Sequence, residues 1–233
     1  MLYTKTVKDE TLELLKNIMS DVTFSDFCLA GGTALALIMG HRISIDLDLF
    51  TTAGFDSSKL EKYLQNNYGF KGSYMEDYTL KGEVDGVKLD FLRHDYRDVS
   101  SRFVEDGIRF YDIEDIAAMK LLAIADNGTR LKDFVDIAYL STKMSLGDML
   151  EAFELKYSQT NSIRALKGLT YYEDIKFDEP IHLTEKSYSW DDIEDRLSKM
   201  IQDENKVFVT MPEKEQRRKI QVDPPSRKKG RRM

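Results

Sequence analysis

The stretch GGTALALIMGHRISIDLDLF, residues 31–50, decides the fold of this chain. It follows a short apolar run, Phe27 to Ala30, which reads as a buried strand that enters a tight turn. The residues after the two glycines predict a compact apolar helix that ends at Gly40. From Ile43 to Phe50 apolar and polar residues alternate strictly, which predicts a second strand. The stretch is therefore a strand, a helix and a strand in close succession.

Two aspartates share one face of the second predicted strand. Asp46 and Asp48 are two residues apart, so their Cβ atoms are about 7 Å apart, with Ile45, Leu47 and Leu49 on the opposite face. Two carboxylates on an otherwise buried strand are costly unless a cation lies between them. Magnesium, which prefers oxygen ligands, fits this pattern. The alternative is an edge strand whose polar face is simply solvated.

The residues Gly31, Gly32 and Thr33 precede the predicted helix. Glycines let a phosphate approach the backbone closely, and the start of a helix offers free N–H groups and the positive end of its dipole. This short motif predicts an anion site, although an ordinary turn has the same composition.

Asp90 lies in VKLDFL, the second strand of a hairpin predicted around the dipeptide Asp85-Gly86. A neighbouring strand would place its carboxylate level with Asp46 and Asp48. Three carboxylates can hold two metal ions about 3.5–4 Å apart, the arrangement that serves phosphoryl transfer. The alternative for Asp90 is an exposed hairpin charge.

The spacing of these residues resembles a known signature. Gly31-Gly32, followed after thirteen residues by Asp46-Leu47-Asp48-Leu49 and by a later strand aspartate, resembles the DNA polymerase β-like nucleotidyltransferase superfamily. The fuller string from residue 31 to 50, together with KDFVDIAYL at residues 132–140, resembles the AbiEii/AbiGii toxin-type nucleotidyltransferases. The resemblance covers roughly residues 25–140.

The resemblance implies a role for each matching residue. Asp46, Asp48 and Asp90 would be metal ligands, and Asp90 would also help to deprotonate an attacking hydroxyl. The phosphates of the nucleotide would be held by Gly31, Gly32 and Thr33, with Arg42 and Ser44 at the border of the same pocket. Because relatives often carry Ser where this chain has Gly32, any hydroxyl contact would come from Thr33.

The later motif contributes charged residues on helices. Lys120 would meet the triphosphate, although helix lysines are usually only solvated; its apolar neighbours favour an anion as partner. We therefore expect Lys120→Ala to impair catalysis with little effect on stability. Lys132, Asp133 and Asp136 match the late motif, and Asp133 and Asp136 share a helix face. They would either hold Lys120 or Arg42 in place or pair at the surface.

The three histidines are weaker candidates. His41 could contact a nucleotide, but a hydrogen bond at a helix end is the simpler expectation. His94 and His182 have no metal-ligand spacing with Cys or another His, which disfavours zinc.

The remaining pattern predicts an α+β fold, a small mixed sheet flanked by helices and followed by a mainly helical part. We expect a nucleotidyltransferase core at residues 1–110, a helical domain completing the site at 111–205 and a basic, loosely held tail at 206–233. The predicted helices span residues 7–20, 57–68, 113–125, 132–140, 146–156, 162–169 and 190–201, and the predicted hairpin spans 74–92.

Composition limits the class of protein. With 42% hydrophobic residues the chain has enough apolar side chains for a core, and no apolar run reaches the length of a membrane span. A secretion signal is not evident, and the single cysteine, Cys28, excludes an internal disulfide, so we expect a cytoplasmic protein.

Charge is unevenly distributed. Residues 206–233 carry ten Lys/Arg and three acidic residues, or +7, so the other 205 residues sum to −14 within a total of −7. An acidic body is a poor general nucleic-acid binder. The tail could be a solubilising segment or expression remnant, a contact for nucleic acid or a partner, or a segment docked on the acidic body.

The sequence-based prediction is a magnesium-dependent nucleotidyltransferase with two Mg²⁺ ions, or Mn²⁺ in their place. It would transfer a nucleotide from an NTP to a hydroxyl acceptor, an RNA such as a tRNA end or, as the alternative, a protein. The resemblance also implies the role of a toxin that a cognate antitoxin protein restrains. Two other functions stay open: a catalytically inactive binding module for a nucleotide or partner, and a small-molecule nucleotidyltransferase of the antibiotic-modifying kind.

Overall fold

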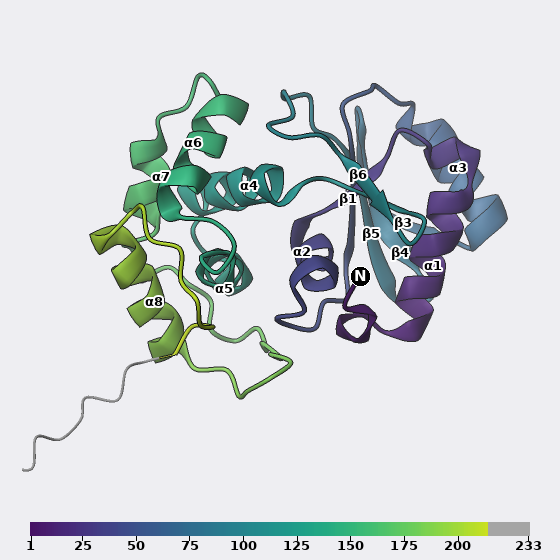
Figure 1. Ribbon diagram of the computed structural model, residues 1–233. Helices are drawn as coiled ribbons and strands as arrows, with labels where there is room; N and C mark the ends of the chain where they lie inside the picture. The colour runs from purple at the N-terminus through teal and green to yellow at the C-terminus, as the bar shows by residue number, and fades with distance from the viewer. Residues whose placement is uncertain (214–233) are drawn as a thin grey trace, which may run out of the picture.

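The computed structural model describes residues 1–213, so most of the predicted basic tail, residues 214–233, lies outside the described residues. The described part forms a strand-rich lobe followed by a helical lobe (Figure 1). The strands are β1 (Cys28–Ala30), β2 (Leu47–Thr51), β3 (Lys71–Glu76), β4 (Thr79–Val84), β5 (Val87–Arg93), β6 (Phe103–Glu105) and β7 (Ile108–Phe110). The helices are α1 (Asp9–Ser20), α2 (Gly31–Met39), α3 (Ser57–Tyr68), α4 (Ile113–Asp126), α5 (Leu131–Leu140), α6 (Leu146–Lys156), α7 (Ser162–Gly168) and α8 (Trp190–Gln202), with short 3-10 turns at Thr4–Thr6 and Val22–Phe24.

All seven strands belong to one mixed sheet in the order β3-β4-β5-β2-β1-β7-β6. The pairs β2–β5 and β1–β7 are parallel and the other neighbours are antiparallel. Helices α1 and α3 cover one face of the sheet, whereas α2 lies on the other face, between the sheet and helices α4 and α5 (Figure 1). This confirms the predicted α+β fold with a mixed sheet and a helical C-terminal part.

The second strand is shorter than its alternating pattern predicts. Leu47 and Leu49 are fully buried as expected, but Ile45 is 49% exposed and β2 begins only at Leu47. The backbone of residues 42–44 is paired elsewhere: Ile43 N–H donates to His182 O, and Ser44 N–H donates to Thr6 O. These contacts with distant segments pull the residues before Leu47 out of the sheet, so Asp46 precedes the strand instead of lying in it.

The predicted single hairpin is two hairpins. The expected strand from Tyr74 to Val84 is interrupted by a turn at Asp77-Tyr78, where Tyr78 takes a left-handed φ of 56°, and this turn joins β3 to β4. A further hairpin, β6–β7, turns at Asp106-Gly107 and was not predicted, although it carries the same Asp-Gly signal as Asp85-Gly86. Its strands have three residues each, too few to show alternation.

The helices from α4 to α8 match their predicted bounds to within one residue at each end. The aromatic side chains of Phe134, Tyr172, Phe177 and Trp190 pack edge to face between these helices and the loops that join them. The segment from Lys206 onward was predicted to be loose, but Phe208 is 7% exposed and lies under the Arg196 guanidinium. Among residues 1–213, no helix combines the length and the apolar character that crossing a bilayer requires.

Candidate functional site

Strand register brings the predicted carboxylates together. Ala30 at the end of β1 lies opposite Asp48, and Asp48 lies opposite Asp90 in the parallel pair β2–β5. Paired residues of neighbouring strands point to the same face, so Asp48 and Asp90 stand side by side, with Asp46 just before β2. All three aspartates are partly exposed to solvent. The carboxylates therefore gather where β1 turns into α2.

Both glycines at that turn are required by close contacts. Gly31 has a left-handed φ of +66°, and a Cβ at this position would overlap Asp48 Oδ2. A Cβ at Gly32 would overlap Nη2 of Arg42. Helix α2 begins at Gly31 without a side-chain cap, so its first N–H groups face the carboxylate site free of a capping oxygen. The backbone can thus receive an anion directly beside Asp48.

Thr33 and Ser44 hold this turn from inside the protein. The Thr33 hydroxyl is hydrogen-bonded to Ser44 Oγ at 2.8 Å and donates to the carbonyl of Asp46. Thr33 is 1% exposed and Ser44 is 9% exposed. The hydroxyl of Thr33 is therefore engaged within the protein, and its contact with a nucleotide stays a prediction. The contact of this hydroxyl with the Asp46 carbonyl fixes Asp46 relative to α2.

Asp136 on α5 is the centre of a buried ionic network. Arg42 donates to it through Nε at 2.7 Å and Nη2 at 2.9 Å, and His41 Nε2 lies 2.8 Å from the same carboxylate. Lys120 Nζ of α4 lies 2.8 Å from Asp136 Oδ2 and 2.6 Å from Asp133 Oδ1. Burial by itself raises the pKa of Asp136, but Arg42 and Lys120 outweigh burial and hold that pKa well below its usual value.

This network decides between the alternatives for the late motif. Asp133 is 2% exposed and Asp136 fully buried, so they do not pair at the surface; they hold Lys120 and Arg42. Lys132 does not take part in it directly, because its ammonium pairs with Glu179. His41 is buried with a pKa lowered by burial, and its predicted hydrogen bond near the helix end is made with Asp136.

Lys120 is buried as its apolar neighbours suggested, at 6% exposure. Burial by itself lowers its pKa, but Asp133 and Asp136 outweigh burial and raise it. Burial raises the pKa of Asp48 to about 6, and Lys120 is the neighbouring charge that opposes this rise most strongly. Lys120 therefore acts on Asp48 from the helical lobe. The expectation of little effect on stability is wrong, because removing a buried cation that neutralises two carboxylates leaves them uncompensated.

Arg130, the residue before α5, was missed by the sequence analysis. Its side chain is 62% exposed, and its Nε lies 3.8 Å from Asp133 Oδ2. Asp133 is the main cause of its raised pKa, and Asp48 adds to the rise. Arg130 is thus an accessible cation within the electrostatic reach of Asp48. The available signal was a basic residue three positions before Asp133, at the start of the predicted helix.

An aromatic group beside Asp48 was also missed. Phe50, two residues after Asp48 on the same face of β2, stacks on His94 with ring centroids 5.5 Å apart. Tyr96, which is 48% exposed, lies 4.8 Å from His94 and 4.8 Å from Tyr157 at the end of α6. The rings of the strand-rich lobe thus contact Tyr157 of the helical lobe, and they lie beyond Asp48 on the side away from Gly31.

The donor atoms fit a hard divalent cation. Asp46, Asp48 and Asp90 offer only oxygen ligands, which suit magnesium or manganese, and the raised pKa of Asp48 shows a carboxylate that lacks sufficient positive charge. Within residues 1–213, no three acidic, His or Cys side chains stand in the geometry of a complete metal site. The Asp90 carboxylate is instead bound to Lys81 Nζ at 2.7 Å.

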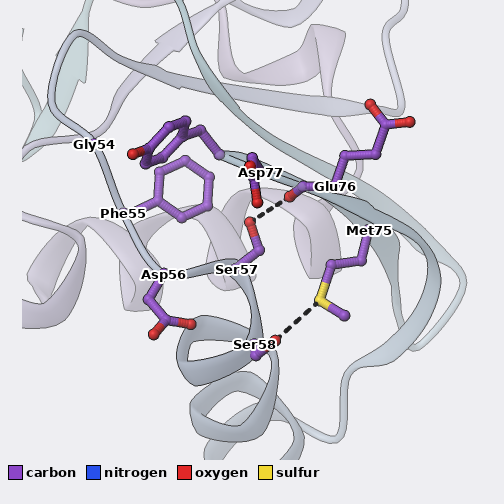
Figure 2. Close-up of a pocket in the computed structure, with 9 residues that line it drawn as sticks. Gly54, Phe55, Asp56, Ser57, Ser58, Met75, Glu76 and Asp77 are labelled. Atoms are coloured by element: carbon purple, nitrogen blue, oxygen red, sulfur yellow. Dashed lines mark hydrogen bonds between the residues drawn. The ribbon is translucent and has the colours of Figure 1, made fainter.

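A separate hollow of about 780 Å³ lies between the loop after β2, the start of α3 and the β3–β4 turn (Figure 2). Ser57 there donates to the carbonyl of Glu76 at 2.7 Å, and Ser58 Oγ lies 3.7 Å from the sulfur of Met75. Asp56, Glu76 and Asp77 line the hollow, and none of the predicted site residues does. Its acidic lining suits neither a phosphate nor a nucleotide.

The mixed sheet, the glycine turn at the start of α2 and the paired strand aspartates define a nucleotidyltransferase. The sequence profile described as nucleotidyl transferase AbiEii toxin, type IV toxin–antitoxin system, matches residues 13–216. The chain belongs to this AbiEii family, which confirms the predicted family and the predicted enzyme class.

Relatives and solved structures agree with this assignment. An uncharacterized protein of Aquifex aeolicus (strain VF5), aq_aa25, is 30% identical over 203 residues, and the match covers 84% of this chain and 97% of the relative. The crystal structure of an H. pylori protein proposed to be a nucleotidyltransferase is similar in fold, with a TM-score of 0.54, 20% identity and coverage of 84% of this chain and 94% of its own. JHP933 from Helicobacter pylori has a TM-score of 0.51, 19% identity and coverage of 84% and 92%.

Proposed function

We propose that this nucleotidyltransferase transfers a nucleotide from an NTP to a hydroxyl group of RNA, with a tRNA end as the first candidate. The observation that carries the proposal is the register that sets Asp48 opposite Asp90, directly beside the uncapped start of α2. The site thus combines carboxylates for divalent ions with a backbone anion site. An enzyme that positions a triphosphate needs both of these parts, carboxylates for the metal ions and N–H groups for the phosphates.

Asp46, Asp48 and Asp90 would hold Mg²⁺, as two ions, or Mn²⁺. Bound divalent ions supply charge neutralisation for the phosphates and for the attacking oxygen. The N–H groups at Gly31 and Gly32 would orient the phosphates. Lys120 stays in the buried network and adds positive potential from the helical lobe.

The chemical step requires one new bond and one broken bond. The acceptor oxygen attacks the α-phosphorus and its proton passes to the Asp90 carboxylate, while the bond from the α-phosphorus to the bridging oxygen breaks and pyrophosphate leaves. Arg130 is exposed and near enough to Asp48 for the two charges to interact, and it would contact the departing phosphates. The nucleobase would stack on Tyr96, the exposed member of the aromatic group.

We further propose that the reaction is toxic and that a cognate antitoxin protein restrains it, since the family is described as the toxin of a type IV system. An antitoxin gene next to the gene for this chain would favour the toxin role. Its absence would favour a small-molecule acceptor.

The experiment is incubation with each radiolabelled NTP, magnesium and either total RNA or total protein, followed by identification of the labelled species. Asp48→Asn is the inactive variant, and Asp126→Asn is the matched control, because Asp126 pairs with Arg164 at the exposed surface of the helical lobe. Label on RNA that is lost in Asp48→Asn but retained in Asp126→Asn supports the proposal.

Label on protein alone would assign a protein acceptor instead. If wild-type protein labels nothing with any NTP, a binding assay with each NTP follows. Protein that binds an NTP without transferring it is a folded binding module, and that outcome refutes the proposed transfer.

A further inference from the structure

The Asp90 carboxylate already forms an ion pair with a lysine side chain from the neighbouring strand of the same sheet. In the antiparallel pair β4–β5, Lys81 lies opposite Asp90, and Lys81 Nζ lies 2.7 Å from Asp90 Oδ2. The row of paired positions across the sheet is therefore Lys81, Asp90, Asp48 and Ala30. Strand register, not a loop, sets a lysine directly beside the proposed third metal ligand.

The Asp48 carboxylate differs from that of Asp90 because, within the described residues, it is not held by a lysine or arginine. Among residues 1–213, the Asp48 carboxylate forms no direct ion pair, although Asp48 lies opposite Asp90 on the neighbouring strand. The same part of the chain contains no set of three side chains in ligand geometry. Of the two facing carboxylates in this part of the chain, that of Asp90 is the one paired with a cation, and the cation is Lys81.

We propose that Lys81 is an internal counter-ion of the metal site, and that a divalent ion binds Asp48 and Asp90 in exchange for the Lys81 ammonium. This inference rests on the proposed use of these aspartates as metal ligands. Magnesium binds carboxylate oxygens at about 2.0–2.1 Å, much closer than the 2.7 Å contact of the Lys81 ammonium with Asp90. A divalent ion shared by Asp48 and Asp90 would offset the charge that Lys81 offsets now and would repel the ammonium, so Lys81 is released to water when the metal enters.

The exposure of the pair makes this exchange easy. The side chains of Lys81 and Asp90 are 39% and 29% exposed, so water competes for both charges. Exposed ion pairs are weak, and the released ammonium is solvated without a burial penalty. Lys120 differs in this respect, because it is buried between two carboxylates and cannot be exchanged at low cost. The two lysines next to the site thus have different roles, one displaceable and one fixed.

The test is metal binding by the ligand-free protein, measured by Mn²⁺ titration with electron paramagnetic resonance at pH 7.5. Lys81→Met should lower the Kd for Mn²⁺ by about two- to fivefold, which corresponds to about 0.4–1 kcal/mol. Lys88→Met is the matched control, because Lys88 lies two residues before Asp90 on the same face of β5 and its removal deletes the same charge. Lys88→Met should lower the Kd clearly less.

A second pair of variants tests the direct contact. In the Asp90→Asn background, Lys81→Met should lower the Kd for Mn²⁺ no more than Lys88→Met does, because the neutral amide no longer holds the lysine and only the general loss of charge remains. Lys81→Met that binds Mn²⁺ no better than Lys88→Met, or more weakly than the wild type, overturns the proposal. Metal binding and nucleotide transfer are separate readouts: protein that shows the Lys81 effect but labels no acceptor refutes the proposed function and leaves the exchange standing.

Discussion

Replacing Asp136 by Asn keeps the shape of the side chain and removes one charge from the buried network. The carboxylate of Asp136 has four contacts at 2.7–2.9 Å, two from Arg42 and one each from His41 and Lys120. An amide offers only one acceptor oxygen, so at least one of these donors loses its partner. Arg42 and Lys120 are then left with Asp133 as the nearest buried anion.

The size of the effect follows from burial. Removing one partner of a fully buried ion pair costs about 3–5 kcal/mol, because an uncompensated charge stays behind. For a chain of this size about 1 kcal/mol corresponds to roughly 2–4 °C in Tm. Asp136→Asn should therefore lower Tm by roughly 6–20 °C. Asp126→Asn is the control, since Asp126 and Arg164 are both more than half exposed and the pair is worth at most about 1 kcal/mol.

The assay is urea unfolding followed by circular dichroism at several pH values. Because the folded-state pKa of Asp136 lies well below 3.8, its stabilisation is complete above the unfolded pKa and is lost as pH falls through the folded pKa. The difference between wild type and Asp136→Asn should thus be constant near neutral pH and shrink below about pH 4. A loss no larger than that of Asp126→Asn, or one independent of pH down to 2, would refute the reasoning.

Three further predictions concern the site itself. Asp48→Asn should abolish transfer and raise the stability of metal-free protein by at most about 3 kcal/mol, because burial raises the pKa of Asp48 to about 6 in the folded protein. This gain should develop as pH rises from about 4 to about 6 and stay constant above that, and urea unfolding with a pH series measures it. Lys120→Met should lower the unfolding free energy by about 3–5 kcal/mol, and a loss below about 1 kcal/mol would show that Asp133 and Asp136 do not depend on it. Gly31→Ala should lose transfer and more stability than Gly69→Ala, because both glycines have a left-handed φ but only Gly31 would clash, with Asp48; equal losses in thermal unfolding would contradict the clash.

Local signals made several elements predictable from the sequence. Helix α3 has its predicted bounds because Asp56 caps its start, accepting from Lys59 N–H, and Gly69 ends it in a left-handed conformation. The Asp85-Gly86 turn likewise fixes the pairing of β4 with β5 and its register, which sets Lys81 opposite Asp90. In each case the information lies within a few residues of the element.

Contacts between distant segments were not predictable in this way. The alternation from Ile43 to Phe50 is real, but partners at Thr6 and His182 decide where β2 begins. The apolar surroundings of Lys120 indicated an anion, yet they could not select Asp133 and Asp136 over the strand aspartates. The register of the parallel pair β2–β5, which sets Asp48 opposite Asp90, joins segments far apart in the chain and is not fixed by a local sequence pattern.

The pairing of the segment around Arg42 with the loop around Leu183 also bears on the order of folding. Ile43 N–H donates to His182 O at 2.8 Å and Thr184 N–H donates to His41 O at 3.1 Å, forming an isolated antiparallel bridge between Arg42 and Leu183. Closing a loop of about 140 residues costs roughly 2–2.5 kcal/mol more in chain entropy than closing one of ten. Two backbone hydrogen bonds cannot offset that cost in an open chain, so the bridge forms only after both lobes have brought its ends together. The bridge is a late event in folding, and its amide protons become protected after those of β2 and α5.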